Sequence, residues 1–170
     1  VLGISNALTA SNATVFEQGT LLAENPDKKV DIQQNLTNNG SVEIYGQGLT
    51  VGNYTASANA RTIIDIHTAA LEVKGTANFN GSRIVADVAK VNEVPKQQEQ
   101  TRTILTAQTL TGFNGDYRVS DHIYPYIDVT SIAQKGNNIE ATYKRNSTEY
   151  VLKKANALTR SAVNTGRNLD

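Results

Sequence analysis

The chain has 170 residues, 39% of them hydrophobic, and its 16 basic and 16 acidic side chains give a formal net charge of zero. A chain of this size and composition has enough apolar surface to bury a core. The balanced charge does not indicate a nucleic-acid surface or a polybasic membrane patch, so we expect no nucleic-acid partner.

Cysteine and methionine are both absent from the sequence. Without cysteine, we expect no disulfide, no thiolate nucleophile and no cysteine-ligated metal. Without methionine, the chain does not begin at a translational start, and Val1 does not open the charged and apolar regions of a signal peptide. We therefore expect a fragment of a longer polypeptide. No run of about 18 apolar residues predicts a membrane-spanning helix in it.

The first 91 residues predict short strands separated by turns. Residues 1–38 contain three brief β-rich runs and the turn-prone residues 24–27, which we interpret as irregular opening rungs. Residues 39–91 repeat a regular pattern of short apolar runs broken by glycine, with Asn39-Gly40 and Asn80-Gly81 as corners. Strands this short bury little alone and must stack on neighbours, which is typical of a β-solenoid.

The remainder of the chain has a different pattern. The polar residues 92–101, which include Pro95, predict a protruding, flexible loop. Residues 102–106, 124–129, 138–143 and 149–153 read as longer, alternating strands, with hairpin turns at Asn114-Gly115 and at residues 136–138. We interpret residues 101–154 as an antiparallel cap that protects the solenoid edge. Residues 155–170 predict a short helix, with Asn156 as its N-cap and Leu158, Ala162 and Leu169 on one face.

Acidic residues on several strands raise the question of polysaccharide cleavage, since many β-helices are such enzymes. Stacked carboxylates are the groups that glycoside cleavage uses. The alternation of the strands instead favours an interpretation of these acids as outward, solvated side chains. The acids concerned are Glu43, Asp65, Glu72 and Asp87.

The two histidines do not predict a catalytic or metal site. The residue types of a Ser-His-Asp catalytic triad occur at Ser120, Asp121 and His122, but no nucleophile motif accompanies them. His67 and His122 lack metal-ligand spacing, so we expect no metal and no cofactor. Asn-x-Ser/Thr sequences such as residues 80–82 are expected by chance in a chain rich in Asn and Thr, and predict no site.

The order of several phrases resembles the C-terminal end of autotransporter passenger domains, over residues 35–170. The phrases are LTNNGSV (36–42), LTVGNYT (49–55), LEVKGTA (71–77), TILTA (103–107), Gly112-Phe113, Tyr117 and IEATYKR (139–145). The N-terminal 35 residues and the insert around Pro95 depart from that pattern.

The resemblance implies an all-β fold, a right-handed parallel β-helix with a hairpin-containing C-terminal cap. It implies passenger rungs over residues 1–100, an autochaperone region over 101–154, and over 155–170 the start of a linker towards an outer-membrane β-barrel. The expected partners are upstream rungs and that barrel in the same polypeptide, with host-surface binding or self-association through the upstream passenger. The expected location is the Gram-negative cell surface, reached through the periplasm, or secretion from it.

The resemblance, joined to the dependence of each rung on its neighbours, implies a non-catalytic module whose cap templates the folding of the rungs. The alternatives are a polysaccharide-binding or polysaccharide-cleaving solenoid and an adhesive stalk acting through its lateral face. The expected rung core is Ile64, Ile66, Leu71, Val73, Phe79, Ile84 and Val88. The folding-core candidates of the cap are Ile104, Phe113, Tyr124, Ile127, Ile139 and Tyr143.

Overall fold

The structure is a computed structural model that describes residues 1–4 and 9–167. Its elements follow one another as short strands with a single α-helix at the end. They are β1 (Leu2–Ile4), β2 (Thr9–Val15), β3 (Thr20–Asn25), β4 (Val30–Asn38), β5 (Ser41–Gly46), β6 (Leu49–Ala56), β7 (Arg61–Asp65), β8 (Leu71–Asn78), β9 (Arg83–Asp87), the 3-10 turn η1 (Val91–Glu93), β10 (Gln100–Thr111), β11 (Tyr117–Val119), β12 (Ile127–Lys135), β13 (Asn138–Arg145) and α1 (Thr148–Arg167).

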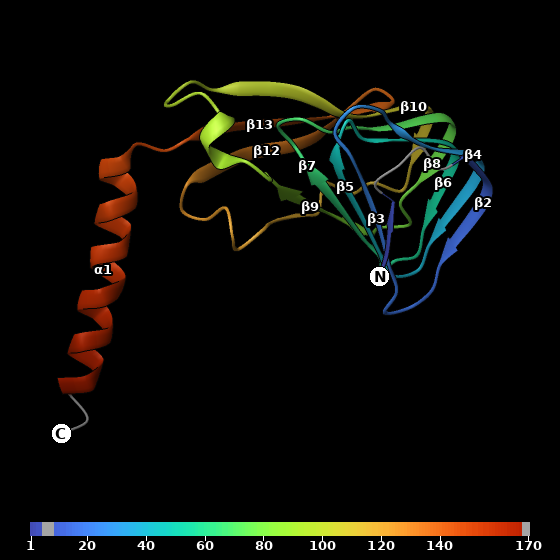
Figure 1. Ribbon diagram of the computed structural model, residues 1–170. Coiled ribbons are helices and arrows are strands. Elements are labelled where there is room, and N and C mark those ends of the chain that lie inside the picture. The colour runs from blue at the N-terminus through green and yellow to red at the C-terminus, as the bar shows by residue number, and fades with distance from the viewer. Residues whose placement is uncertain (5–8, 168–170) are drawn as a thin grey trace.

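Consecutive strands alternate between two sheets, which are the walls of a β-solenoid of about four turns. The odd sheet has the order β1-β3-β5-β7-β9-β11, and all its pairs are parallel. The even sheet has the order β12-β13-β10-β8-β6-β4-β2. Figure 1 shows the two walls with their rungs stacked side by side. The predicted parallel β-helix is therefore confirmed.

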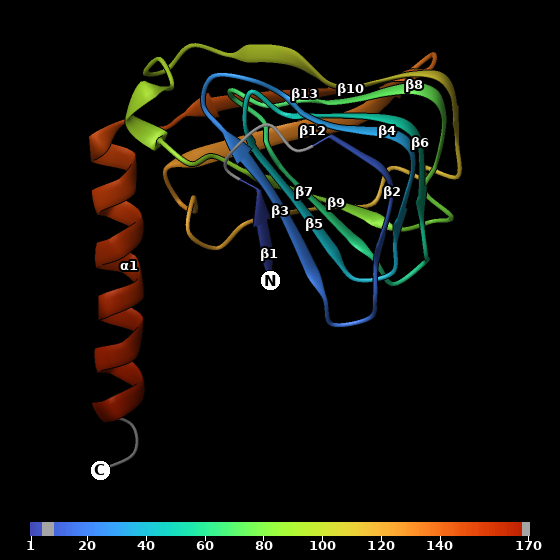
Figure 2. The same ribbon diagram turned by 45° about the vertical axis from the view of Figure 1, so that its right-hand side comes forward.

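The strands of the even sheet bend along their length (Figure 2). The pairing register shifts midway in each parallel pair of this sheet, between Ala10 and Asn12 and between Ile32 and Asn35, for example. Register shifts of this kind bend and twist the strand that carries them. The bend lets one sheet form two sides of the solenoid around a closed core.

The core consists of inward side chains that stack in columns from rung to rung. Leu49, Leu71 and Leu105 are register partners on β6, β8 and β10, and all three are fully buried. The Phe79 ring lies 5.6 Å from the Tyr54 ring and 5.8 Å from the Phe113 ring, measured between centroids, which extends an aromatic column towards the C-terminal end. All seven residues expected in the rung core are buried.

The opening residues are more regular than their sequence predicts. β2 pairs with β4 and β3 with β5, in the same parallel arrangement as the later rungs. The buried side chains of these opening rungs include Val15, Leu21, Ala23, Val30 and Ile32. The expectation of irregular rungs before residue 38 is therefore wrong, because the inward positions continue even where glycine punctuation is sparse.

The C-terminal end of the solenoid changes strand direction, as predicted. β10 is parallel to β8 on one side and antiparallel to β13 on the other, and β12 and β13 form an antiparallel hairpin. Gly136, with φ of +61°, makes the hairpin turn. The predicted hairpin at Asn114-Gly115 is wrong: these residues form a corner between β10 and β11, which lie in different sheets.

The helix begins earlier than predicted, and the strand predicted over residues 149–153 is wrong. The Ser147 hydroxyl accepts a hydrogen bond from the Tyr150 N–H at 3.1 Å and is the N-cap, in place of Asn156. Tyr150 and Val151, although β-rich, lie in the helix that follows this cap. The side chains of Leu158 and Ala162, and all of Leu169, lie outside the described residues.

The buried Tyr54 phenol makes the core sensitive to alkali. Its hydroxyl lies 2.6 Å from Thr62 Oγ1 and accepts a hydrogen bond from Asn38 Nδ2 at 3.0 Å. Burial raises its pKa from 10.0 to about 12, although both hydrogen bonds oppose the shift. Between these two values the unfolded chain loses the phenol proton while the folded chain keeps it, so stability falls as the pH rises.

We expect this group to cost about 2 kcal/mol of unfolding free energy between pH 10 and pH 12. The measurement is denaturant unfolding at stepped pH, with phenolate absorbance followed in parallel. In Tyr54→Phe the alkaline loss of unfolding free energy should shrink by that amount. The loss due to Tyr143 should remain, because burial also raises the pKa of Tyr143 to about 12. An unchanged alkaline slope in Tyr54→Phe would contradict the assignment.

Candidate functional site

The candidate site is the junction where the hairpin β12–β13 closes the solenoid. Four of the six folding-core candidates are buried there: Ile104, Ile127, Ile139 and Tyr143. Phe113 is half-buried, with its ring edge against Phe79. The junction thus has an apolar core continuous with that of the rungs.

Tyr124 does not belong to this core, contrary to the prediction. Its side chain is 55% exposed, and the strand expected to begin there begins instead at Ile127. Pro125 has no N–H to donate to a sheet, so the preceding residues form a turn. In that turn, the inward apolar position is occupied by the fully buried Ile123.

Tyr143 connects the hairpin to a rung turn through its hydroxyl. The Tyr143 hydroxyl and His67 Nδ1 are 2.8 Å apart, and the two rings meet edge to face at 6.0 Å between centroids. Burial raises the pKa of Tyr143 to about 12. His67 follows β7, so this contact ties β13 to a turn two rungs away.

Two arginines add further connections at the junction. Arg102 on β10 donates from one guanidinium nitrogen to the carbonyls of Ile66 at 2.6 Å and Ala69 at 3.3 Å. Arg145, at the end of β13, donates to the carbonyl and the side-chain oxygen of Asn92, both at 3.1 Å. The predicted protruding loop is thus anchored at its start, where Val94 is also buried. Its mobility stays a prediction.

Two of the four acids considered for catalysis are buried, so the prediction that all of them point into solvent is wrong. Asp65 and Asp87 are register partners at the ends of β7 and β9, with 2% and 4% exposure. The Asp65 carboxylate accepts hydrogen bonds from the backbone N–H groups of His67, Thr68 and Ala89, at 3.0 to 3.2 Å. These bonds satisfy turn N–H groups, which is a structural role.

Asp87 is held by side chains from other rungs. It accepts hydrogen bonds from the Tyr45 hydroxyl and the Val88 N–H, and its Oδ1 lies 3.0 Å from His122 Nδ1. Burial, and then the hydrogen bond to Asp87, raise the pKa of Tyr45 well above its usual range. Tyr45 therefore remains a proton donor to this carboxylate.

The four acids do not form one row. Glu43 lies on β5 in the odd sheet and Glu72 on β8 in the even sheet. Glu72 pairs with Lys29 at 2.7 Å, and this hydrogen bond lowers the pKa of the Glu72 carboxyl. Only Asp65 and Asp87 meet, and their carboxylates are occupied by structural hydrogen bonds.

Ser120 and His122 meet, but not in the geometry of a triad. His122 Nδ1 lies 3.0 Å from both Ser120 Oγ and Asp87 Oδ1, while Nε2 faces the Val88 carbonyl at 3.2 Å. A general-base histidine needs its acid on one ring nitrogen and the nucleophile on the other. The arrangement instead fixes the turn before β12 to the end of β9.

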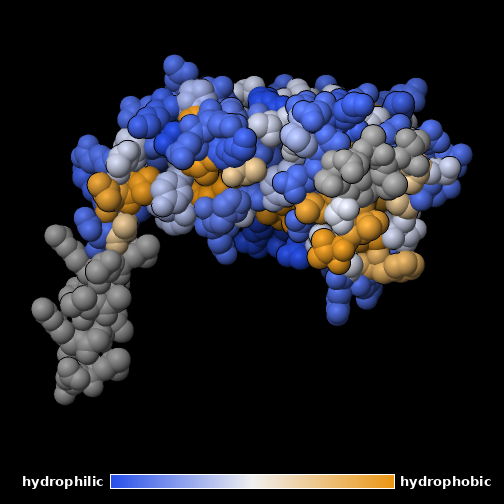
Figure 3. Space-filling view, in the orientation of Figure 1, coloured by the Kyte–Doolittle hydropathy of each residue, from blue (hydrophilic) through white to orange (hydrophobic). Residues whose placement is uncertain are grey.

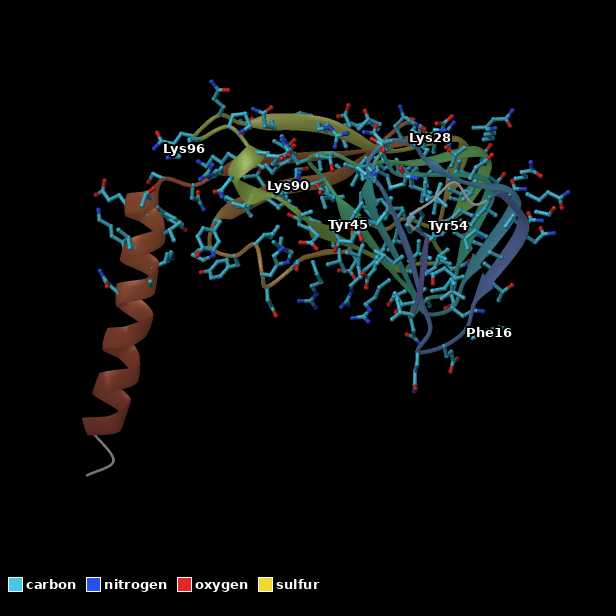
Figure 4. The ribbon with its side chains drawn as sticks, viewed as in Figure 1. Phe16, Lys28, Tyr45, Tyr54, Lys90 and Lys96 are labelled. Carbon is cyan, nitrogen blue, oxygen red and sulfur yellow. The ribbon has the colours of Figure 1, made fainter. Side chains whose placement is uncertain are left out.

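A lateral groove of about 280 Å³ crosses the turns that follow β3, β5, β7 and β9. Tyr45 and Lys90, both in its lining, are labelled in Figure 4. Among the described residues, no group of three or more His, Asp or Glu side chains is placed to hold a metal ion. In the same part of the chain, no helix is long and apolar enough to cross a bilayer.

Comparison with known proteins adds no relative: no family model, no curated protein and no solved structure matches this chain. The fold therefore rests on the structure itself. The resemblance to autotransporter passengers remains a hypothesis carried by its sequence phrases.

Sequence reasoning did not identify His67, Arg102 and Arg145 as junction residues. His67 and Tyr143 are 76 residues apart, and Arg145 and Asn92 are 53 apart. No local sequence pattern predicts such contacts, because they depend on which rung the hairpin β12–β13 packs against. The rarity of histidine was the one available signal. The sequence has two histidines, His67 and His122, and each connects a rung to the C-terminal end.

Proposed function

We propose that this chain is a C-terminal passenger segment of an autotransporter, in which the hairpin end is the folding template for the rungs. One observation carries the proposal: the parallel strands of the even sheet are followed, at the C-terminal end, by the antiparallel hairpin β12–β13. A hairpin makes contacts between residues close in sequence, and such contacts form early at a small entropy cost. The rungs depend on neighbours and gain from a preformed edge.

The opposite end of the solenoid supports the choice of partner. Within the described residues, β1 and β2 each pair on one side, and Val1, Leu2 and Phe16 are exposed there. Figure 3 shows hydrophobic surface at that end, in addition to smaller hydrophobic areas nearer to α1. We propose that further rungs of the same polypeptide cover this edge, and that α1 leads towards an outer-membrane barrel at the cell surface.

Pulse-labelled hydrogen exchange during refolding tests the template role. We expect amides of β10, β12 and β13 to become protected before those of β3, β5 and β7, because the hairpin must exist before a rung can dock on it. Tyr143→Ala should delay protection throughout the chain. Tyr124→Ala, which removes the same kind of side chain from an exposed position, should leave the order and rates unchanged. Earlier protection of β3, β5 and β7 would contradict the proposal.

The lateral groove favours a second candidate, a stalk that binds an elongated polymer such as a polysaccharide. The groove crosses four turns along the solenoid axis, a path of roughly 14 Å at the usual strand spacing. Cleavage of such a polymer is not supported in the same way, because the Asp65 and Asp87 carboxylates are engaged by the protein itself. Rungs that fold without help from the hairpin would favour this candidate.

A further inference from the structure

Three asparagines form a row on the outer surface of the even sheet. Asn12 on β2 is the register partner of Asn35 on β4, which in turn pairs with Asn53 on β6. Asn35 Nδ2 donates to Asn12 Oδ1 and Asn53 Nδ2 donates to Asn35 Oδ1, each at 3.1 Å. All three residues are exposed. The row therefore runs along the solenoid axis, on the side where β2, β4 and β6 lie next to one another in Figure 1.

Each asparagine of this row begins an Asn-x-Thr sequence. An inward apolar residue follows, Ala13, Leu36 or Tyr54, and then an outward threonine. The threonines are also in register, with Thr14 opposite Thr37 and Thr37 opposite Thr55. Asn-x-Thr is the acceptor sequence for N-linked glycosylation. Three acceptor sequences are thus stacked about 4.8 Å apart on one exposed line.

We propose that Asn12, Asn35 and Asn53 are acceptors for N-linked sugars, transferred by a cellular glycosyltransferase from a donor sugar activated by phosphate. In this reaction the asparagine Nδ2 forms a bond to the anomeric carbon. The bond from that carbon to the phosphate oxygen breaks, and the phosphate leaves with its electron pair. One Nδ2 proton passes to a base of the transferase. The proposal is independent of the template role.

The hydrogen bonds of the row are compatible with an attached sugar. The Nδ2 atoms of Asn35 and Asn53 each donate to one acceptor in the row, and Asn12 Nδ2 donates to Gln34 Oε1 at 3.2 Å. An amide nitrogen carries two hydrogens, so substitution of one leaves the other for this bond. Because the residues are exposed, the substituent extends into solvent.

The row ends before the hairpin junction. Asn53 Oδ1 accepts a hydrogen bond from the Thr76 N–H at 2.9 Å, and the neighbouring Gly75 leaves no space for a side chain against Asn53. The next strands, β8 and β10, carry no acceptor sequence. Sugars on the row would therefore decorate the rungs without covering β13.

Three other acceptor sequences lie in the described residues, at Asn39, Asn80 and Asn146, and they are internal controls because their geometry differs. Ser41, the partner serine of Asn39, is buried. Asn80 Nδ2 donates to the Ala56 carbonyl at 2.8 Å, and its partner hydroxyl Ser82 is fully buried. Asn146 Nδ2 donates to the Pro125 carbonyl at 2.7 Å and so holds the turn before β12. We expect these three residues to be unmodified, because the serines that complete the Asn39 and Asn80 sequences are buried and Asn146 is itself only half-exposed.

Peptide mapping by mass spectrometry, on the protein isolated from the cells that produce it, tests the proposal. The fragmentation method must preserve the sugar linkage, so that each site is read separately. We expect added sugar mass at Asn12, Asn35 and Asn53, and none at Asn39, Asn80 or Asn146. Absence of sugar from Asn12, Asn35 and Asn53 would overturn the proposal, and so would equal modification of all six acceptor sequences.

A pair of variants separates the acceptor sequence from the hydrogen-bonded row. Thr37→Val removes the hydroxyl but keeps Asn35 and a β-branched side chain, whereas Thr37→Ser keeps the hydroxyl. We expect at least tenfold lower occupancy of Asn35 in Thr37→Val and near-normal occupancy in Thr37→Ser. Occupancy is read on peptides, so the result does not depend on a stable fold. Persistent modification of Asn35 in Thr37→Val would overturn the proposal.

Discussion

Tyr143→Ala is expected to destabilise the C-terminal end by about 3 to 5 kcal/mol, the usual cost of removing a buried aromatic ring. The side chain is fully buried, and its ring and hydroxyl both contact His67. Because β13 is the strand that closes the even sheet, loss of its largest core side chain weakens the closure itself. For a chain of this length we expect a fall in Tm of about 12 °C.

Two controls separate the ring from its hydroxyl and from general aromatic content. Tyr143→Phe keeps the packing and loses only the hydrogen bond to His67, so it should cost about 1 kcal/mol. Tyr124→Ala removes an exposed ring from the adjoining turn and should change stability by less than about 0.5 kcal/mol. Calorimetry and denaturant unfolding provide the values. A Tyr124→Ala effect as large as that of Tyr143→Ala would show that burial does not decide the outcome.

Gly48→Ala is expected to cost about 4 kcal/mol or more, through backbone geometry rather than lost packing. Gly48 has φ of +101°, and a Cβ there would overlap the carbonyl oxygen of Ala70 on the next rung. That carbonyl accepts the Leu49 N–H, while Gly48's own carbonyl accepts the Val30 N–H. Since the overlapping atoms belong to the backbone, no side-chain rotation relieves the clash, and three successive rungs must shift.

Gly136→Ala is the matched control for this prediction. Gly136 also has a positive φ, +61°, but an added Cβ meets nothing within 4 Å. It should cost only the conformational strain of about 1 to 2 kcal/mol. Equal losses of unfolding free energy in the two variants would mean that the close approach at Ala70 is unimportant.

The rungs were predictable because their signals are local. Glycine and Asn-Gly corners alternate with β-branched runs between residues 39 and 91, and the hairpin turn at Gly136 has the expected sequence. The strand predicted over residues 149–153 is wrong because β-propensity takes effect only where a segment pairs with another strand, and these residues lie in α1. There the local cap at Ser147 determines the structure.

The candidate site was only partly predictable. Alternation correctly places Ile139 and Tyr143 on the buried face, because both lie within a regular strand. It fails for Asp65 and Asp87, which are the last residues of their strands, where the chain turns and the carboxylates accept turn N–H groups. From sequence alone, the three Asn-x-Thr sequences are no more than chance predicts. The strand register shows that they are stacked on one line.

The position of β13 has a mechanical consequence. β13 ends at Arg145 and α1 begins at Thr148, so tension applied through α1 reaches β13 first. This strand lies between β12 and β10 and is hydrogen-bonded to both. A load along its axis is therefore shared by two ladders in shear, which must break together rather than one bond at a time. A strand at the outer edge would peel at a much lower force, so the order of the last three strands makes this end suited to bearing a pull.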